Sequence, residues 1–343
     1  MRTPGMTLKE LAEMLSLSPT TVSRALNGYP EVNAETRARI EAAAREHGYQ
    51  PNTMARKLAT GKAMAVGHVI PLGEHQMINP IFAEFMTGAS EVYSKVGYET
   101  ILTVVPEKGE EDAYRDLARR HSVDGVIVHA PRTGDPRIKL LTELGLPFVL
   151  HGRPVGDDGP SVCLDIKNAR AFRQATQFLI DLGHRRIALL NGLEQISFAL
   201  RRRAGYEQAM ERGGIATDPS LSAHQEMTET NGYNTTMAWM QRAERPTAIL
   251  TSSIISAIGV SRAVRDAGLE LGHDVSLITH DDDLSFLRNE GDPPRFTTTF
   301  SSISAAGHRC AEMVLDLIAG KPVESEVWDC QLVEGRSTGP APA

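Results

Sequence analysis

Two short helical patterns with a tight turn between them occupy residues 7–28. Thr7 can cap the first helix, and Glu10, three residues later, completes a capping box. The second helix is expected to start after Ser18, whose hydroxyl suits an N-cap. Pro19 takes a position in the first turn, where a missing N–H is tolerated. These signals predict a pair of short helices whose ends are fixed by local side chains.

The pattern of apolar residues gives each of these helices one buried face. Their apolar residues recur at helical spacing: Leu8, Leu11, Ala12, Leu15, Val22, Ala25 and Leu26. The outward face of the second helix carries hydroxyls and one guanidinium, from Thr20, Thr21, Ser23 and Arg24. Such groups suit phosphates and base edges. With a third helix expected from an Asn33 cap to Gly48, the segment reads as a helix-turn-helix; the alternative is a small helical bundle without a DNA function.

The distribution of charge favours DNA binding over a plain bundle. Residues 1–62 hold nine Lys/Arg and six Asp/Glu, whereas the remaining chain holds 27 and 37. A locally basic segment on an acidic chain is expected when only the N-terminus meets phosphate.

Residues 18–27 and 52–59 resemble the headpiece and hinge of the lactose-repressor (LacI/GalR) family of bacterial transcription regulators. The resemblance covers nearly all of the chain and implies a homodimer on a pseudo-palindromic operator. It implies DNA contacts by a set of headpiece and hinge residues: Thr7, Ser18, Pro19, Thr20, Thr21, Ser23, Arg24, Asn27, Asn33, Asn52, Met54, Ala55 and Leu58.

Residues 51–62 are expected to form a hinge helix. Pro51 blocks continuation of the third helix, and Asn52 can cap a new one of about two turns, shorter than the ~12–15 residues that an isolated helix needs. The resemblance implies that two such helices pair in the minor groove, where Leu58 wedges between base steps. The alternative is an ordinary linker helix packed on the body.

From residue 65 onward, short apolar strands alternate with amphipathic helices. Strands are predicted at 65–70, 99–104, 125–129, 148–151, 187–191, 248–251 and 275–280, and helices at 81–96, 169–182, 199–212, 231–243 and 257–267. This order predicts parallel sheets covered by helices, and a Gly/Pro cluster at 152–161 separates two such series. The fold class is therefore α/β, with an all-α helix-turn-helix headpiece. The resemblance makes the body two-lobed and periplasmic-binding-protein-like.

The expected domains are a headpiece at 1–50, a hinge at 51–62 and an effector-binding and dimerisation body at 63–343. The resemblance implies three strands that cross between the lobes, near Cys163, near 296–300 and near Val327. Lobe one then takes about 63–162 and 299–326, and lobe two about 163–298 and 327–340.

Several classes of function are disfavoured. No Gly-x-Gly-x-x-Gly, P-loop or Gly-x-Ser-x-Gly pattern occurs, and His184 and His280 lack metal-ligand spacing, so we expect no enzyme, cofactor or metal site. The three cysteines form no Cys-x-x-Cys pair. The chain shows no run of ~18 apolar residues and no signal sequence, which predicts a cytoplasmic, nucleoid-associated protein without a membrane partner.

The candidate effector residues come from the resemblance. Arg202, three residues before Gly205, and Asp281 match the family's ligand-binding positions, and their donors and acceptors suit sugar hydroxyls. Thr279 and His280 stand where Gly-Tyr is usual in the family. Weaker matches to the family's cleft positions, placed by counting from the flanking strands, are Phe82, His129, His151, Met227 and Ser253.

Residues 151–153 and 189–192 resemble rhizobial-type regulators of α-glucoside use. They favour a neutral disaccharide such as maltose, trehalose, sucrose or palatinose. A nucleobase is disfavoured because aromatic residues make up only 5% of the chain.

The leading interpretation is a repressor that a sugar releases from DNA. A sugar-binding transport or receptor protein would have the same two lobes, but residues 7–58 argue against it. The sequence leaves open the identity of the sugar, the sign of its effect, the operator sequence and any oligomer beyond the dimer.

Overall fold

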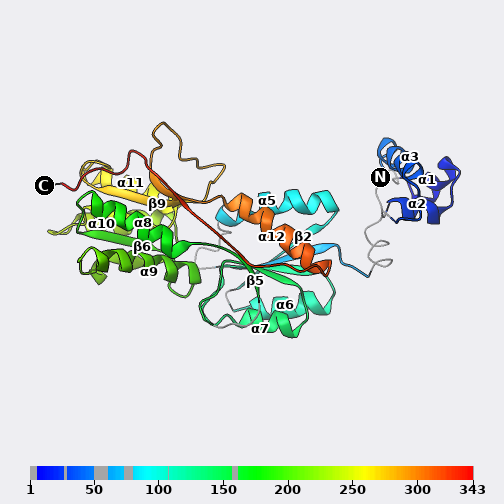
Figure 1. Ribbon diagram of the computed structural model, residues 1–343, viewed down its shortest axis with the longest axis horizontal. Helices are drawn as coiled ribbons and strands as arrows, with labels where there is room; N and C mark the ends of the chain where they lie inside the picture. The colour runs from blue at the N-terminus through cyan, green and yellow to red at the C-terminus, as the bar shows by residue number, and fades with distance from the viewer. Residues whose placement is uncertain are drawn as a thin grey trace. The chain divides into compact units, whose positions relative to one another are not determined.

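The computed structural model describes residues 6–26, 29–49, 61–72, 80–106, 108–156 and 161–342. The chain divides into two compact units, Met1–Ala63 and Met64–Ala343 (Figure 1). Most of the expected hinge lies outside the described residues, as do five of the expected DNA contacts: Asn27, Asn52, Met54, Ala55 and Leu58.

The N-terminal unit contains the expected helix-turn-helix and a third helix. Its helices are α1 (Leu8–Leu15), α2 (Pro19–Leu26) and α3 (Ala34–Glu46). One apolar cluster joins them, with Leu11, Val22 and Ile40 fully buried. The three helices therefore share a single small core, and the predicted apolar faces are confirmed.

The first lobe of the body is built on a six-stranded parallel sheet in the order β11-β5-β4-β3-β1-β2. Its strands are β1 (Ala65–Leu72), β2 (Glu99–Pro106), β3 (Gly125–His129), β4 (Phe148–His151), β5 (Val162–Ile166) and β11 (Glu326–Trp328). Helices α5 (Pro80–Val96) and α12 (Ile303–Ile318) cover one face, and α6 (Glu110–Arg119) and α7 (Pro136–Glu143) the other (Figure 1).

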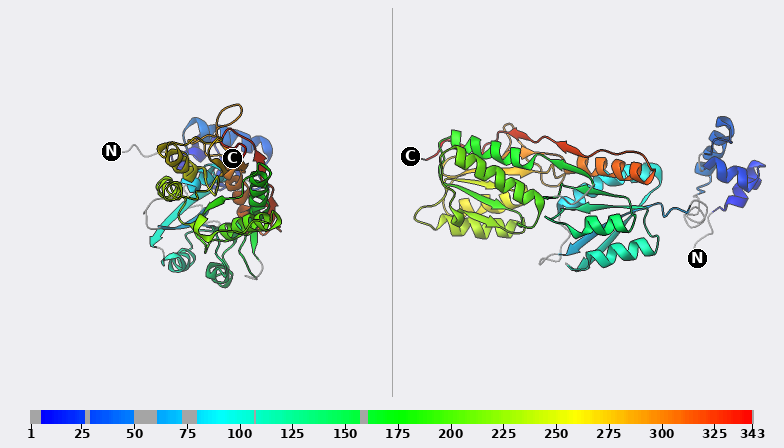
Figure 2. Two further views of the ribbon diagram at one scale, coloured as in Figure 1. Left: turned by 90° about the vertical axis from the view of Figure 1, so that its left-hand side faces the viewer. Right: turned by 60° about the horizontal axis from the view of Figure 1, so that its bottom comes forward.

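The second lobe has a sheet in the order β12-β10-β9-β8-β6-β7, in which only the edge strand β12 is antiparallel to its neighbour. Its strands are β6 (Ile187–Asn191), β7 (Ser222–His224), β8 (Ala248–Thr251), β9 (Ser276–Asp281), β10 (Thr297–Phe300) and β12 (Gln331–Val333). Helices α8 (Asn168–Asp181) and α9 (Ser197–Arg212) pack on one face, and α10 (Glu229–Met240) and α11 (Ile254–Asp266) on the other. Figure 2 shows the two layered lobes.

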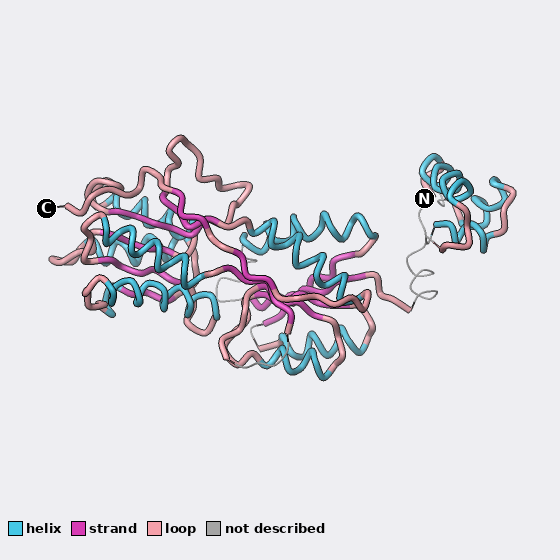
Figure 3. Tube along the Cα trace, viewed as in Figure 1, coloured by secondary structure: helices cyan, strands magenta, loops and turns pink. Residues whose placement is uncertain are grey.

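Within the described residues the chain passes between the lobes after Ile166, after Phe300 and after Trp328. The segment that crosses after Trp328 lies beside the other two crossing segments, because β11 pairs with β5 in the first lobe and β12 pairs with β10 in the second (Figure 3). Each passage lies a few residues beyond the lobe boundaries expected near 163, 299 and 327. The reason is that a crossing strand is one continuous extended segment, and only its hydrogen bonds with neighbouring strands decide where it changes sheets.

Most of the predicted strands and helices are present, and β3, β4, β6 and β8 have the predicted bounds. The sequence interpretation missed α6, α7, β7 and α12. Within the described parts of the chain, no helix is long and apolar enough to cross a membrane.

Candidate nucleic-acid interface and effector cleft

Helix α2 presents a polar face to solvent. Thr20 and Arg24 are exposed and stand four residues apart, so they are neighbours on the helix surface. Thr21 and Ser23 beside them are half-buried, while Val22 faces the core. The structure therefore exposes two of the expected DNA contacts fully and two in part, on a rigid helix.

Three further expected DNA contacts act as helix caps. Thr7 Oγ1 accepts from the N–H of Glu10 at 3.3 Å, Ser18 Oγ from that of Thr21 at 3.0 Å, and Asn33 Oδ1 from that of Thr36 at 2.8 Å. Each satisfies a backbone donor that a helix start leaves unpaired. These side chains fix the geometry of the headpiece, and exposed Pro19 opens α2 as predicted.

Two arginines of α3, which the sequence interpretation did not single out, hold the turns of the headpiece. Arg39 Nη2 donates to the carbonyl of Leu15 at 2.6 Å, next to the turn between α1 and α2. Arg37 Nη2 donates to the carbonyl of Tyr29 at 2.7 Å, in the connection after α2. Their guanidinium groups therefore support the loops on both sides of α2.

In the first lobe, three expected effector residues form one aromatic wall. His129 and His151 end the neighbouring strands β3 and β4, and their rings lie 5.8 Å apart. Phe82, near the start of α5, meets the His129 ring edge-on at 5.0 Å. All three are half-buried, and they lie over the buried side chains of His68 and Phe85, two partners the sequence interpretation missed.

The histidines of this wall are held uncharged. Burial lowers the pKa of His151 to about 4, and it lowers that of His129 well below the usual value, with the neighbouring histidines adding to the effect. Burial also lowers the pKa of His68 to about 3, and its Nδ1 lies 3.0 Å from His129 Nε2. Near neutral pH the wall is thus an uncharged surface that retains hydrogen-bonding nitrogens.

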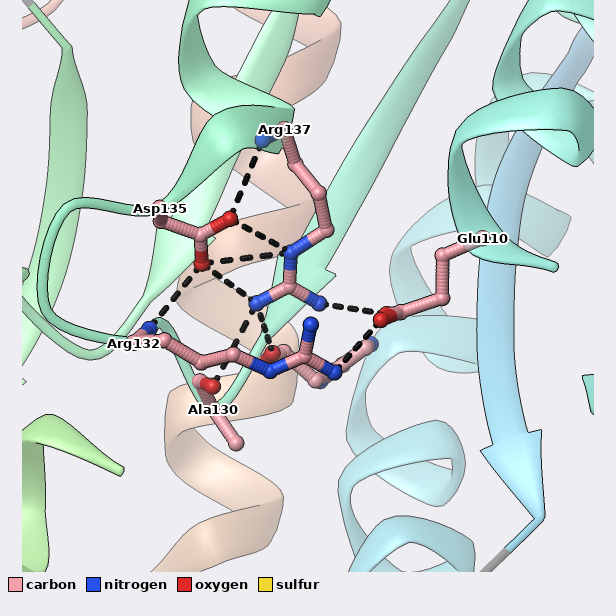
Figure 4. A network of polar contacts seen from close by, with 6 residues as sticks. Glu110, Ala130, Arg132, Asp135 and Arg137 are labelled. Atoms are coloured by element: carbon pink, nitrogen blue, oxygen red, sulfur yellow. Dashed lines mark hydrogen bonds and ion pairs between the residues drawn. The ribbon is translucent and has the colours of Figure 1, made fainter. Parts of the chain in front are cut away.

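A buried ion-pair network supports the loop after β3 (Figure 4). Arg137 Nη1 donates to Glu110 Oε1 at 2.7 Å, and its Nη2 donates to Asp135 Oδ2 at 2.6 Å. The same Nη2 lies within hydrogen-bonding distance of the carbonyl oxygens of His129 (3.2 Å) and Ala130 (3.3 Å). The network therefore fixes the backbone that carries His129, including Ala130 at a φ of 46°.

In the second lobe, Arg202 lies on α9 and is almost fully buried. Its Nε donates to Asn168 Oδ1 at 2.8 Å, and its Nη1 donates to the carbonyl of Ser252 at 2.6 Å. The guanidinium also lies over the rings of Phe172 and Phe198, at 5.1 and 4.8 Å from their centres. Two of its nitrogens are thus fixed by the protein, and Nη2 has no recorded hydrogen bond within the described chain.

The structure does not bring Asp281 to Arg202. Asp281 Oδ1 accepts from the N–H of Asp283 at 2.9 Å, and the residue borders a groove of about 430 Å³ together with Phe300 and Gln331. The next residue, Asp282, is the one whose charge acts on Arg202. The sequence interpretation did not single out Asp282, and the alternation of side chains along β9 places it on the other side of the strand from Asp281.

Of the two remaining candidates, Ser253 directly follows Ser252, whose carbonyl accepts from Arg202 Nη1. Ser253 is fully buried as the N-cap of α11, and its Oγ accepts from the N–H of Ile255 at 3.2 Å. Met227 is half-buried in the connection between β7 and α10.

Contacts between described residues of the two lobes lie around the cleft. The N–H of Ser197, at the start of α9, donates to the carbonyl of Pro131 at 3.0 Å. Glu84 of α5 accepts from the N–H and the hydroxyl of Ser285 at 3.0 and 2.7 Å. Arg201 donates to the carbonyl of Pro154 at 2.6 Å. These contacts bring the carboxyl ends of both sheets together, the usual position of ligands in open α/β folds.

Among the described residues, no group of three His, Cys, Asp or Glu could hold a metal ion. His184 is buried and bonds to side chains of its own lobe, with Nδ1 3.0 Å from Thr247 Oγ1 and Nε2 2.9 Å from Ser276 Oγ. Its role is therefore structural.

Comparisons with known proteins agree with this architecture. Residues 7–52 match the family described as bacterial regulatory proteins, lacI family, and residues 176–338 match the periplasmic binding protein-like domain. The transcriptional regulator AglR of Rhizobium meliloti (strain 1021) is 45% identical over 98% of this chain and 95% of its own length. The transcriptional regulator RafR of Escherichia coli is 35% identical over 93% of this chain and 94% of its own length.

Two solved structures of similar proteins cover almost the whole chain. The lac repressor dimer bound to operator and the anti-inducer ONPF has a TM-score of 0.78 and 25% identity over 98% of this chain and 100% of its own. The complex of the transcriptional regulator CelR with cellobiose has a TM-score of 0.70 and 27% identity over 97% and 99%. The protein described here therefore belongs to the LacI family of bacterial regulatory proteins and is a helix-turn-helix transcriptional regulator, not an enzyme.

Proposed function

We propose that the protein is a homodimeric repressor that binds a pseudo-palindromic operator and is released from it by a small neutral sugar. The observation that carries the proposal is helix α2, whose capped start and buried Val22 hold Thr20 and Arg24 outward on a rigid face. A helix of this kind reads base edges in the major groove with its exposed side chains.

The dimer and the operator symmetry are supported by the likeness to a lac repressor dimer seen on its operator. Two copies of α2, related by a twofold axis, would read two half-sites. The proposal includes the hinge contacts by Asn52, Met54, Ala55 and Leu58, together with the headpiece contact by Asn27. The proposed repressor acts in the cytoplasm and associates with the nucleoid, because that is where operator DNA lies.

The proposed effector site lies between the lobes, where the wall formed by Phe82, His129 and His151 faces the lobe that carries Arg202. Its uncharged rings and few hydrogen-bonding groups suit a neutral sugar, and the similar CelR was solved with cellobiose. We propose an α-glucoside disaccharide as this sugar, because residues 151–153 and 189–192 resemble regulators of α-glucoside use.

We propose induction as the sign of the response. A ligand shifts operator affinity only if it binds the two lobe arrangements unequally, and such couplings are typically about 1–3 kcal/mol. A repressor of sugar catabolism has to leave its operator when the sugar arrives.

The DNA part is tested by selecting operators from random duplexes and measuring binding by fluorescence anisotropy. Arg24→Ala should weaken binding, and Thr20→Ala should change the preference at one base pair by about 1–3 kcal/mol. Arg45→Ala removes the same charge from an exposed position on α3 and serves as the control. Unchanged affinity and preference in the two α2 variants would contradict the assignment.

The effector part is tested by titrating maltose, trehalose, sucrose and palatinose into the protein–operator complex. Release by at least one of them is expected. Tighter operator binding with sugar would reverse the proposed sign. Sugar binding without any sequence-specific DNA binding would favour the transport or receptor alternative.

A further inference from the structure

We infer that His68 is a positioning residue which, with Tyr93 behind it, holds His129 in the tautomer whose accessible nitrogen donates a hydrogen bond at the effector cleft. The inference rests on the proposed effector site and adds to it a relay of three side chains, Tyr93, His68 and His129. It also assigns the kind of ligand atom that meets His129, which is an acceptor oxygen.

His68 lies in the middle of β1, underneath the aromatic wall. It is fully buried, its Nδ1 lies 3.0 Å from His129 Nε2, and its Nε2 lies 3.5 Å from the hydroxyl of Tyr93 on α5. The ring centres of the two histidines are 5.3 Å apart and their planes differ by 26°. The rings therefore meet edge to edge, where N–H groups and lone pairs lie. The three side chains form one chain of hydrogen bonds that leads from α5 to the cleft.

Each histidine of this chain carries a single ring proton. Burial lowers the pKa of His68 to about 3 and that of His129 well below the usual value, and burial raises the pKa of Tyr93. Near neutral pH both imidazoles are thus uncharged and the phenol keeps its proton. A neutral imidazole donates from one nitrogen and accepts at the other. All the hydrogen bonds of the chain therefore run in one direction, either from Tyr93 towards His129 or the reverse.

The buried hydroxyl of Tyr93 decides between the two directions. Tyr93 is 1% exposed, and His68 Nε2 is the one hydrogen-bond partner recorded for its hydroxyl among the described residues. If His68 donated to Tyr93, the phenol proton would be buried without an acceptor, and an unpaired buried donor lowers stability. If Tyr93 donates to His68, every proton within the chain has an acceptor. The favoured order is from Tyr93 to His68 and from His68 to His129.

This order fixes what His129 offers to a ligand. His129 accepts at Nε2 and carries its own proton on Nδ1. No hydrogen bond to Nδ1 is recorded in the described chain, and Nδ1 is not one of the buried side-chain atoms that lack a partner, so this nitrogen is accessible. His129 ends β3 beside His151, and its carbonyl lies 3.2 Å from Arg137 Nη2. The backbone and the tautomer are thus both held, and an ether or hydroxyl oxygen of the ligand can accept from Nδ1–H.

Nuclear magnetic resonance gives the tautomer of each ring directly. Two-bond correlation spectra are recorded on deuterated full-length protein whose 11 histidines carry ¹⁵N in the ring. The signals of His68 and His129 are identified by their loss in His68→Asn and His129→Asn. Without any sugar, we expect both rings to be protonated at Nδ1. A proton on Nε2 of His129 would overturn the inference.

Tyr93→Phe tests the origin of this direction, because it removes the hydroxyl and retains the ring. Without the donor at His68 Nε2, both tautomers become available to His68 and therefore to His129. We expect the spectrum of Tyr93→Phe to show His129 protonated partly at Nε2. A tautomer that remains entirely Nδ1–H in this variant would overturn the role of the relay.

Release of the protein from its selected operator tests the effect on effector binding, with maltose, trehalose, sucrose and palatinose as probes. His68→Asn keeps an amide N–H near the position of Nδ1, whereas His68→Leu fills the site without a donor. We expect His68→Leu to raise the half-release concentration at least tenfold and His68→Asn to change it less than threefold. Operator affinity without sugar should be unchanged in both variants.

Equal losses of sugar response in His68→Asn and His68→Leu would show that His68 only fills space, and would overturn the inference. If none of the four sugars releases the wild-type protein, the proposed inducer fails, while the sugar-free spectra still decide the tautomer of His129. Failure of the proposed function and failure of the relay are therefore distinguishable.

Discussion

Replacing Arg137 with methionine should destabilise the first lobe, because one guanidinium compensates two buried carboxylates. The side chains of Arg137, Glu110 and Asp135 are 3%, 4% and 0% exposed. Methionine retains an apolar stem but no charge. Removing one partner of a buried ion pair typically costs about 3–5 kcal/mol. Since Arg132 still pairs with Glu110, we expect a loss near the lower end, about 3 kcal/mol.

The loss should depend on pH through Asp135. Burial raises the pKa of this carboxyl, but hydrogen bonds and charge from Arg137, with backbone N–H groups, outweigh burial and hold the pKa below its usual value. Its stabilisation is therefore present above the unfolded pKa, about 3.9, and is lost as pH falls through the lower folded pKa. In Arg137→Met the pKa of Asp135 rises, so ionisation destabilises the variant as pH increases towards 7. The difference in stability should be larger at pH 7 than at pH 4.5.

Urea unfolding followed by circular dichroism at both pH values measures this difference. The control is Arg119→Met on α6, because Arg119 pairs with Asp116 while 73% exposed, and such surface pairs contribute about 0–1 kcal/mol. Equal midpoints for the two variants, or a difference that does not change with pH, would refute the reasoning.

Three further predictions concern helix packing, helix capping and sugar binding. Gly88→Ala should destabilise the body, because a Cβ there would lie 1.9 Å from the carbonyl oxygen of Ser304 where α5 crosses α12. Thermal unfolding measures the loss, and Ser90→Ala, at an exposed position on the same helix, is the control. Ser253→Ala should cost about 1 kcal/mol of stability, as for other lost N-caps, with no change in sugar response; a lost response would return Ser253 to the effector site. Arg202→Lys should abolish sugar release while operator binding persists, since lysine lacks the planar fork that reaches Asn168 and Ser252; a normal titration would contradict this.

Local patterns in the sequence were sufficient for the headpiece. The capping box at Thr7, the Ser18 cap and the apolar spacing involve residues within a few positions of one another, so their geometry is fixed by one or two turns of helix. The same holds for strands β3, β4, β6 and β8, which are short apolar runs bounded by polar residues. The order of these elements was enough to predict parallel sheets, and the family resemblance added the two lobes.

The effector cleft depended on tertiary structure. The family resemblance pointed to Asp281, but which of two adjacent aspartates lies on the side of Arg202 depends on the side of the sheet that each residue of β9 presents. That side is set by packing against helices far away in the sequence. Likewise, the resemblance pointed to Ser253 as a ligand contact, and only the tertiary structure shows that its hydroxyl accepts from the N–H of Ile255 at the start of α11.

The sequence by itself determined the family, the helix-turn-helix and the alternating strands and helices, because each depends on residue types that lie within a few positions of one another. Only the tertiary structure decided where the chain changes lobes, which histidines share one wall, and that Glu110, Asp135 and Arg137 form a single buried network. The physical reason is that hydrogen bonds and ion pairs between distant residues form only after the sheets have brought those residues together, and no local pattern records which partner each one meets.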